Sequence, residues 1–307
     1  MAIVNSDFLA GLLTNFRAIF QQELGDLDTN MTLYKEIATI FQSTSDKETY
    51  AWLGSVPAMS EWKDRRKLAG MYENDYTLTN KDYEATIEVD RNTIEDDKYG
   101  LIAPRIRGLA LRAARFFNEK VFTQLDLGET YKAWDGAVMF NAARTIGDSG
   151  SFSNLLSGNY SDSTTEILDG LDAAVAAMRK FKDDRGVKMN LIPDCIICAP
   201  EREMMIQTAL FPPVAGEVRP ELSYFPRNRI FVSPFITQNS GKDFYVACTK
   251  AEVKPVILQM RKEPEIDALD DPKSEHVFMN RTFLYGVNSR FTTGFGDPRT
   301  IIKLHNT

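Results

Sequence analysis

Histidine is scarce in this sequence, with only His276 and His305 among 307 residues. Histidine is the side chain that most often transfers protons or binds metals near neutral pH, so a histidine-based catalytic site has at most two candidates. The sequence also contains neither a glycine-rich phosphate-binding loop nor a nucleophile elbow. These absences disfavour an enzyme, and we name no catalytic residue, no cofactor and no metal ligand.

Cysteine is almost as scarce, with Cys195, Cys198 and Cys248 alone. Three cysteines do not make a disulfide framework, which favours synthesis in a reducing cytoplasm. Cys195 and Cys198 have the spacing of a redox pair, but they lie in the apolar run 191–199 rather than at the start of a helix. Buried structural cysteines are therefore favoured, and a thiol-dependent enzyme stays as the alternative.

Long apolar runs and an excess of basic residues are also absent. No run approaches the roughly 20 apolar residues of a membrane-spanning helix, and no secretory signal opens the sequence, so we expect no membrane partner. The net charge of −7 argues against a protein that grips nucleic acid over much of its surface. It leaves open a container whose inner wall attracts DNA weakly.

The strongest pattern that is present predicts a long helix over residues 101–127. Ile102, Ile106 and Leu109 share one side of a 3.6-residue period, whereas Arg105 and Arg112 fall on another side. Such a helix would be roughly 35–40 Å long. It could act as a beam across an elongated subunit, or it could be an ordinary core helix of a globular protein.

A second amphipathic helix is expected over residues 5–24, with Phe8, Leu12, Phe16 and Phe20 on its apolar side. So much aromatic surface must be buried somewhere. Two interpretations stay open. The helix packs on its own domain, or it is an arm that packs on a neighbouring subunit.

Charged residues then gather in two places. The first is a basic cluster beside an aromatic residue, with Trp62, Arg65, Arg66 and Lys67. This could be a nucleic-acid patch, but acidic residues interleave it, which favours a solvated or subunit-facing surface. The acidic run 95–97 similarly invites a metal site, although acids near a helix start are the simpler reading.

The second is a strand over residues 83–89, in which Glu84 and Glu88 form part of a charged face. Residues 76–79 are expected to pair with this strand across a turn at 80–82. A two-stranded hairpin cannot bury a core alone, so it needs a partner surface, and another subunit could supply it.

The remaining pattern mixes helices and strands, which indicates the α+β class. Residues 147–162 are rich in Gly, Ser, Asn and Asp and read as an exposed, mobile loop. Ser163 opens a capping box for a helix that ends near 185. A buried strand at 191–199 is followed by a helix start at Pro200. Further short strands are expected at 229–232, 244–248, 253–259, 276–279, 283–287 and 300–304.

Taken together, the sequence resembles the major head subunit of Mu-like phages, through an ordered series of short segments along most of its length. It departs from the family pattern after Phe140, where Asn141–Arg144 follow and the family's histidine has no counterpart. The segments that carry the resemblance are Tyr50-Ala51-Trp52-Leu53-Gly54, Pro57, Glu61-Trp62, Asn80-Lys81, Tyr83-Glu84, Arg91, Glu95-Asp96-Asp97, Gly100, Pro104, Gln259-Met260-Arg261-Lys262, His276-Val277-Phe278-Met279, Phe283-Leu284-Tyr285-Gly286, Arg290 and Gly294-Phe295-Gly296.

The resemblance implies the α+β major-capsid fold shared by tailed phages and herpesviruses. Five parts are expected by this likeness: an N-terminal arm and lead-in (1–54), an extended hairpin loop over the adjacent subunit (55–92), a peripheral domain with the long spine helix and a mobile insertion (93–199), an axial domain (200–248) and C-terminal strands that return to the peripheral domain (249–307).

The resemblance also implies function: a major capsid protein that self-assembles, as hexamers and pentamers, into the icosahedral shell around double-stranded DNA. The implied location is the virion, with assembly in the host bacterial cytoplasm. Scaffold and portal proteins and non-specifically bound DNA are the implied partners. A storage nanocompartment with the same fold is the alternative. The inter-subunit contact candidates are Phe8, Leu12, Phe16, Phe20, Trp62, Arg65, Arg66, Lys67, Glu84 and Glu88.

Overall fold

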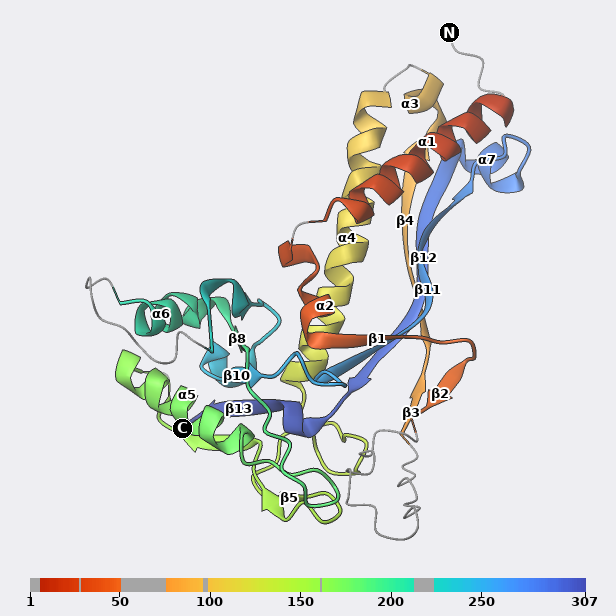
Figure 1. Cartoon of the computed structure of the whole chain (residues 1–307). Coiled ribbons are helices and arrows are strands. Elements are labelled where there is room, and N and C mark those ends of the chain that lie inside the picture. Colours follow the sequence, from red (N-terminus) through yellow and green to blue (C-terminus); the bar gives the residue numbers. More distant parts are fainter. Residues whose placement is uncertain (1–5, 28, 51–75, 96–98, 161, 213–223) are drawn as a thin grey trace.

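The computed structural model describes residues 6–27, 29–50, 76–95, 99–160, 162–212 and 224–307. In this part of the chain, helix α4 (Tyr99–Asp126) runs beside a long sheet, and a second sheet with its own helices lies at the lower end of α4 (Figure 1). The mixture of helices and sheets confirms the predicted α+β class. None of the described helices is long and apolar enough to cross a membrane.

The long sheet has the strand order β1-β11-β12-β4. β1 runs parallel to β11, and the pairs β11–β12 and β12–β4 are antiparallel. Helices α1 and α4 cover one face of this sheet (Figure 1). The bounds are α1 Ser6–Gly25, β1 Ala38–Gln42, β4 Lys81–Asp90, β11 Val256–Leu269 and β12 Thr282–Phe295.

The alternation in β4 produces this one-sided packing. Val89 is buried and Tyr83 and Ile87 are half-buried, whereas Glu84 and Glu88 are exposed. Because successive side chains on a strand point to opposite faces, the apolar set turns toward the helices and the charged set turns away. The predicted strand with one charged face is therefore confirmed.

The second sheet has five strands in the order β7-β13-β10-β8-β9. Every residue of β8 and β10 is buried, and α5 packs with α6 over the sheet in one apolar cluster. Ser163 caps α5 as predicted, because its side chain accepts a hydrogen bond from Glu166 N–H. The bounds are β7 Leu155–Gly158, α5 Thr164–Met178, β8 Cys195–Cys198, α6 Pro200–Leu210, β9 Ile230–Val232, β10 Phe244–Ala247 and β13 Ile301–Asn306.

The strand pairing of this sheet links three of the expected parts. α5 and β8 fall within the expected peripheral domain (93–199), and β13 falls within the expected C-terminal strands (249–307). Both strands pair with β10 of the expected axial segment (200–248), and the domain boundaries stay a prediction. Only β11 and β12 of the last segment run back along α4.

The expected hairpin between residues 76–79 and 83–89 is wrong. β3 (Thr77–Thr79) pairs with β2 (Lys47–Thr49), and β4 pairs with β12. Asn80 joins β3 to β4 and is buried, with its side chain donating to Ser43 Oγ and accepting from Gln259. The chain therefore continues from β3 into β4 where a turn was predicted.

Three further predictions are wrong. Residues 147–162 contain β6 (Ser151–Phe152) and β7, and β7 pairs with β13, so the expected mobile insertion is part of the fold. Residues 276–279 are helical, because Ser274 accepts a hydrogen bond from Val277 N–H and starts α7 (Glu275–Asn280). The helix expected to end near 185 ends at Met178. The remaining elements are α2 Leu33–Ile37, α3 Arg91–Glu95 and β5 Arg144–Thr145.

Candidate assembly surfaces

The apolar side of α1 is used inside its own subunit. Leu12, Phe16 and Phe20 are at most 8% exposed and pack against α4 and the long sheet. The ring of Phe16 meets that of Tyr285 edge-on, with 5.1 Å between the centroids. The structure therefore shows the own-domain interpretation for these three side chains, and a contact with a neighbour would have to use the polar side of the helix.

The other expected contact residues divide into two groups. Glu84 and Glu88 lie on β4 and are exposed. The side chain of Phe8 and the basic cluster of Trp62, Arg65, Arg66 and Lys67 lie outside the described residues, as do the side chains of the acidic run 95–97. Their roles stay predictions.

The long sheet leaves one face without a helix in the described part of the chain, and we call it the outer face (Figure 1). Strand register places its residues in rows across β4, β12 and β11, and three of these rows surround its middle. The rows are Glu84–Asn288–Glu265, Thr86–Gly286–Asp267 and Glu88–Leu284–Leu269.

The middle rows of the outer face are acidic. Four of these nine residues carry carboxylates and none is basic, but the neighbouring row Asp82–Arg290–Lys262 adds two basic residues to the same sheet. Glu265 pairs with Lys262 at 3.1 Å, and both are exposed, so that pair contributes little. Within the described residues, no basic side chain forms an ion pair with Glu84, Glu88 or Asp267. Repulsion among these like charges would fall if a cationic group bound nearby.

A shallow hollow of about 330 Å³ lies in the middle of the outer face. Leu269, Leu284 and Gly286 supply apolar lining, and Glu84 and Asp267 also line it. Leu269 is 44% exposed although it is aliphatic. The outer face thus combines an apolar depression with acidic side chains, which is a composition suited to a contact with another molecule.

Helix α4 presents basic side chains on the helix side of the same sheet. Arg105, Arg112 and Arg115 of α4 are exposed along one side of the helix. Between α4 and β4 lies a groove of about 460 Å³, lined by Tyr83 and Phe116 together with two arginines, Arg112 and Arg115, and two glutamates, Glu84 and Glu119. The exposed side of α4 is therefore richer in basic residues than the middle rows of the outer face.

The tip of the β11–β12 hairpin carries a smaller apolar surface. Helix α7 exposes Phe278 and Met279 by 80% and 71%. The same helix orders His276 through Asn280 and Thr282, whose side-chain atoms lie 3.0 and 3.3 Å from the two ring nitrogens. Both ring nitrogens of His276 therefore lie within hydrogen-bond distance of side chains from the same hairpin.

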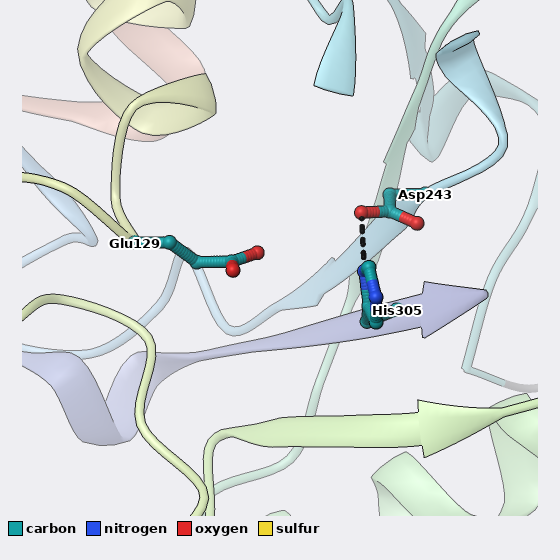
Figure 2. Close-up of side chains that lie close together, drawn as sticks. All are labelled: Glu129, Asp243 and His305. Atoms are coloured by element: carbon teal, nitrogen blue, oxygen red, sulfur yellow. Dashed lines mark hydrogen bonds and ion pairs between the residues drawn. The ribbon is translucent and has the colours of Figure 1, made fainter. Parts of the chain in front are cut away.

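One group of side chains has the composition of a metal site. Ligand atoms of Glu129, Asp243 and His305 lie within 4.8 Å of one another, and Asp243 and His305 are joined at 2.9 Å (Figure 2). However, the Lys303 ammonium contacts Glu129 at 2.5 Å and Asp243 at 2.9 Å. A lysine cation already neutralises this cluster, so its composition fits a buried ion-pair network better than a metal centre.

The network also sets the charge state of Asp243. Burial alone would raise the pKa of this carboxyl, but hydrogen bonds from Asn306 N–H, Lys303, Asn239 and His305 outweigh burial and hold its pKa below the usual value. Asp243 is therefore an anion. The loop after α4, which carries Glu129, is tied in this way to β13.

The cysteines are unsuited to thiol chemistry. Cys195 and Cys198 lie in the fully buried strand β8. Burial, with a further contribution from the negative charge of Asp194, raises the pKa of Cys195, and burial with Glu203 raises the pKa of Cys198 to about 12. Burial also raises the pKa of Cys248. A thiolate, the reactive form, is thus scarce at neutral pH.

Sequence reasoning missed most of the outer face. It identified Glu84 and Glu88, but placed the β11 strand at 253–259 and left out Glu265, Asp267 and Leu269. The signal was present for the two carboxylates, because residues 265–268 alternate charged and apolar side chains. The cluster around Lys303 had no comparable signal, since its members come from three distant segments.

Comparisons with known proteins agree with this architecture. The family model described as "Mu-like prophage major head subunit gpT" matches residues 9–171 and 227–307. The chain is 26% identical over 296 residues to the Mu-like prophage FluMu major head subunit of Haemophilus influenzae, covering 96% of this chain and 72% of that one. It is 25% identical over 294 residues to the major capsid protein of Escherichia phage Mu, with the same coverage.

Among solved structures, the chain is similar to the procapsid of bacteriophage JBD30. The TM-score is 0.61 at 24% identity, and the match covers 98% of this chain and 75% of that one. A likeness at this identity shows the fold.

Proposed function

The chain belongs to the family of Mu-like prophage major head subunits, and from this premise we propose that it assembles, as hexamers and pentamers, into an icosahedral head that encloses double-stranded DNA. Its fold is that of tailed-phage capsid proteins. As a major head subunit it is a structural protein and not an enzyme. Assembly, rather than turnover, is thus the activity that its surfaces must explain.

The observation that carries the proposal beyond the family match is the outer face. A sheet of three long strands packs helices on one side and leaves acidic rows around an apolar hollow on the other. Sheets in monomeric proteins expose polar faces routinely, but an apolar depression set among unpaired carboxylates is suited to a partner. In a self-assembling protein, the available partner is another copy.

Contacts between copies are proposed for two segments. Residues 55–92 would lie over the adjacent subunit, with Glu84 and Glu88 of β4 at the described end of that segment. The N-terminal helix would contribute only its polar side, since its apolar side is buried in its own chain. Each contact can be weak, because several contacts per subunit add by avidity. A closed shell also needs such contacts to tolerate different subunit environments.

Interactions with other components follow from charge. The basic side of α4, with Arg105, Arg112 and Arg115, is suited to weak, sequence-independent contact with DNA phosphates. Scaffold and portal proteins are the further partners proposed for a head subunit. The virion shell would then be the protein's final location, after assembly in the cytoplasm of a bacterial host.

The direct test is negative-stain microscopy of the purified protein, combined with sedimentation. Closed shells, tubes, or hexamer and pentamer rings are expected, either from the protein alone or after co-expression with the neighbouring head genes. A protein that remains a monomer or dimer in both preparations contradicts the proposal.

A storage nanocompartment is the second candidate, because it uses the same fold with a different cargo. Co-purifying material distinguishes the two: double-stranded DNA or scaffold supports the head, whereas a single encapsulated enzyme supports storage. The family match favours the head. The thiol-dependent enzyme considered from the sequence is excluded by the same family membership.

A further inference from the structure

We propose that the buried side chain of Gln259 is a positioning residue, which fixes the direction in which residues 51–75 leave their own subunit and thereby the geometry of the assembled shell. The proposal rests on the assembly function above and deepens it. The structure that Gln259 would orient is the neck, by which we mean β2 with the adjoining Tyr50 and β3 with the adjoining Tyr76.

The neck is too short to hold a direction by itself. β2 and β3 form only three residue pairs. Tyr50 N–H adds one more hydrogen bond by donating to the Tyr76 carbonyl at 2.7 Å. An isolated two-stranded ribbon is at best marginally stable in water. The orientation of the neck must therefore come from the surface on which it packs.

That surface is the face of the long sheet turned away from α4. Ile257 of β11 clusters with Tyr50 and Leu78 of the neck, whereas its neighbour Leu258 clusters with residues of α4. Because successive side chains on a strand point to opposite faces, Gln259 points to the same side as Ile257, toward the neck. A polar side chain is thus set into an otherwise apolar contact.

A glycine on β12 lets the neck approach the sheet closely. A Cβ at Gly294 would lie 2.6 Å from a methyl carbon of Leu78 and 2.8 Å from the Tyr76 hydroxyl. The same hydroxyl accepts a hydrogen bond from Phe295 N–H at 2.8 Å. The second strand of the neck is therefore in direct contact with β12.

The amide of Gln259 reaches both strands of the neck. Its Oε1 accepts a hydrogen bond from the Tyr50 hydroxyl at 2.9 Å. Its Nε2 donates to Asn80 Oδ1 at 2.8 Å and to the Leu78 carbonyl at 3.3 Å. Gln259 is fully buried, and a buried amide that loses its partners is costly. A rotation of the neck would break hydrogen bonds to both strands at once.

A small rotation at the neck is magnified along the chain that it carries. Chain length alone lets residues 51–75, which leave and return through one neck, reach up to roughly 40 Å. A rotation of about 10° at the base would then move the far end by about 7 Å, which is enough to break a specific contact. A closed shell repeats each contact around its rings, so such an error accumulates. Gln259 would therefore act on the shell without touching a neighbour.

Spin labels on unassembled subunits test the positioning directly. One label is placed at Thr49→Cys on the neck and the other at Arg105→Cys on α4, where both residues are exposed and the native cysteines are buried. Double electron–electron resonance should give one narrow distance peak in this labelled parent protein. Gln259→Met keeps the length of the side chain but removes its hydrogen bonds, and it should broaden or displace the peak. An unchanged peak overturns the proposal.

Tyr50→Phe is the milder second variant. It removes one hydroxyl and should broaden the peak less than Gln259→Met does. If Gln259→Met does not fold, Tyr50→Phe decides alone, and an unchanged peak in Tyr50→Phe then overturns the proposal.

The matched control is Asn154→Leu. Asn154 is also a fully buried amide, but it donates to the Met139 and Pro298 carbonyls instead of to the neck. Asn154→Leu should lower the urea midpoint of unfolding, as Gln259→Met does, and leave the distance peak unchanged. Equal broadening in the two variants would show a general loosening of the fold and overturns the positioning role.

Particle size tests the consequence for assembly. The unlabelled protein, Asn154→Leu and Gln259→Met are compared by negative-stain microscopy under conditions in which the unsubstituted protein forms particles. The first two should give one particle size, and Gln259→Met should give mixed sizes and open sheets. A single, unchanged size in Gln259→Met overturns the effect on the shell. Absence of particles from the unsubstituted protein would contradict the head function alone, because the distance measurement does not depend on assembly.

Discussion

The two sheets of this protein use similar apolar residues for different purposes. In the five-stranded sheet, β8 and β10 are buried along their whole length, and helices, loops and neighbouring strands cover them. In the long sheet, β4 and β12 alternate, so that one face packs on α1 and α4 and the other is left to solvent. The first sheet therefore serves the stability of the subunit, and the second leaves a surface for its neighbours.

The largest expected effect comes from comparing the stability loss of one substitution in each sheet. Phe244→Ala in β10 should lower the free energy of unfolding by about 3–5 kcal/mol, because a fully buried ring leaves a cavity. Leu284→Ala on the outer face is the control and should cost under about 1 kcal/mol. Urea unfolding of both variants measures this, and equal losses would show that the outer face is part of the core.

Phe20→Ala tests whether α1 belongs to its own subunit. Phe20 is fully buried against α4 and the long sheet, so about 3 kcal/mol of subunit stability should be lost even in dilute, unassembled protein. An arm that packed only on a neighbour would give no loss in the dilute protein. Thr14→Ala, at an exposed position on the same helix, is the matched control.

Lys303→Met tests the ion-pair network that ties the loop after α4 to the five-stranded sheet. The substitution leaves Asp243 buried with fewer donors, and should cost about 3 kcal/mol at pH 7, near the low end for breaking a buried pair. Lys250→Met, at an exposed site, should cost almost nothing. Thermal unfolding at pH 7 compares them.

The same network predicts a pH dependence. Because the pKa of Asp243 is lowered in the folded protein, its carboxylate stabilises the fold above the unfolded value of about 3.9, and this contribution is lost as pH falls through the folded value. In Lys303→Met the pKa of Asp243 in the folded protein should rise, because one of the donors that lower it is lost. The carboxylate of Asp243 then contributes less to the free energy of unfolding, even at pH 7. A stability curve from pH 2 to 7 with equal acid slopes in both proteins would contradict this.

The smallest effect concerns the cysteines, which report on the five-stranded sheet without perturbing it. Cys195 and Cys198 should react with a thiol reagent only as fast as the sheet opens, because burial raises their pKa values. Reaction within seconds in native protein would show that β8 is accessible. A cysteine placed at Leu269 on the outer face should react at once.

Patterns confined to one segment were predictable from the sequence. The periodicity of α4, the alternation of β4 and the capping box of α5 each depend on neighbouring residues, and each was found within a few positions. The capping signal at Ser274 is equally local, and it starts α7 where the sequence analysis predicts a strand at 276–279.

Partner choice between distant strands was not predictable in the same way. Nothing near β13 indicates that it pairs with β10 and β7 rather than with strands along α4. Polar composition also led to a wrong prediction. Asn154 lies in the segment predicted as an exposed loop, but its amide is fully buried and donates hydrogen bonds to the Met139 and Pro298 carbonyls. The outer face needed the register of three strands, which no single segment contains.

The pairing of β1 with β11 has a consequence for the order of events in the cell. Ala38 meets Val256, so β1 is made long before its partner exists. At about 5–20 residues per second, synthesis of the roughly 200 residues between them takes about 10–40 s. β4 is likewise synthesised well before β12, the strand with which it pairs. The outer face therefore does not exist on a nascent chain, and a subunit becomes competent to join its neighbours only after its own sheet has closed.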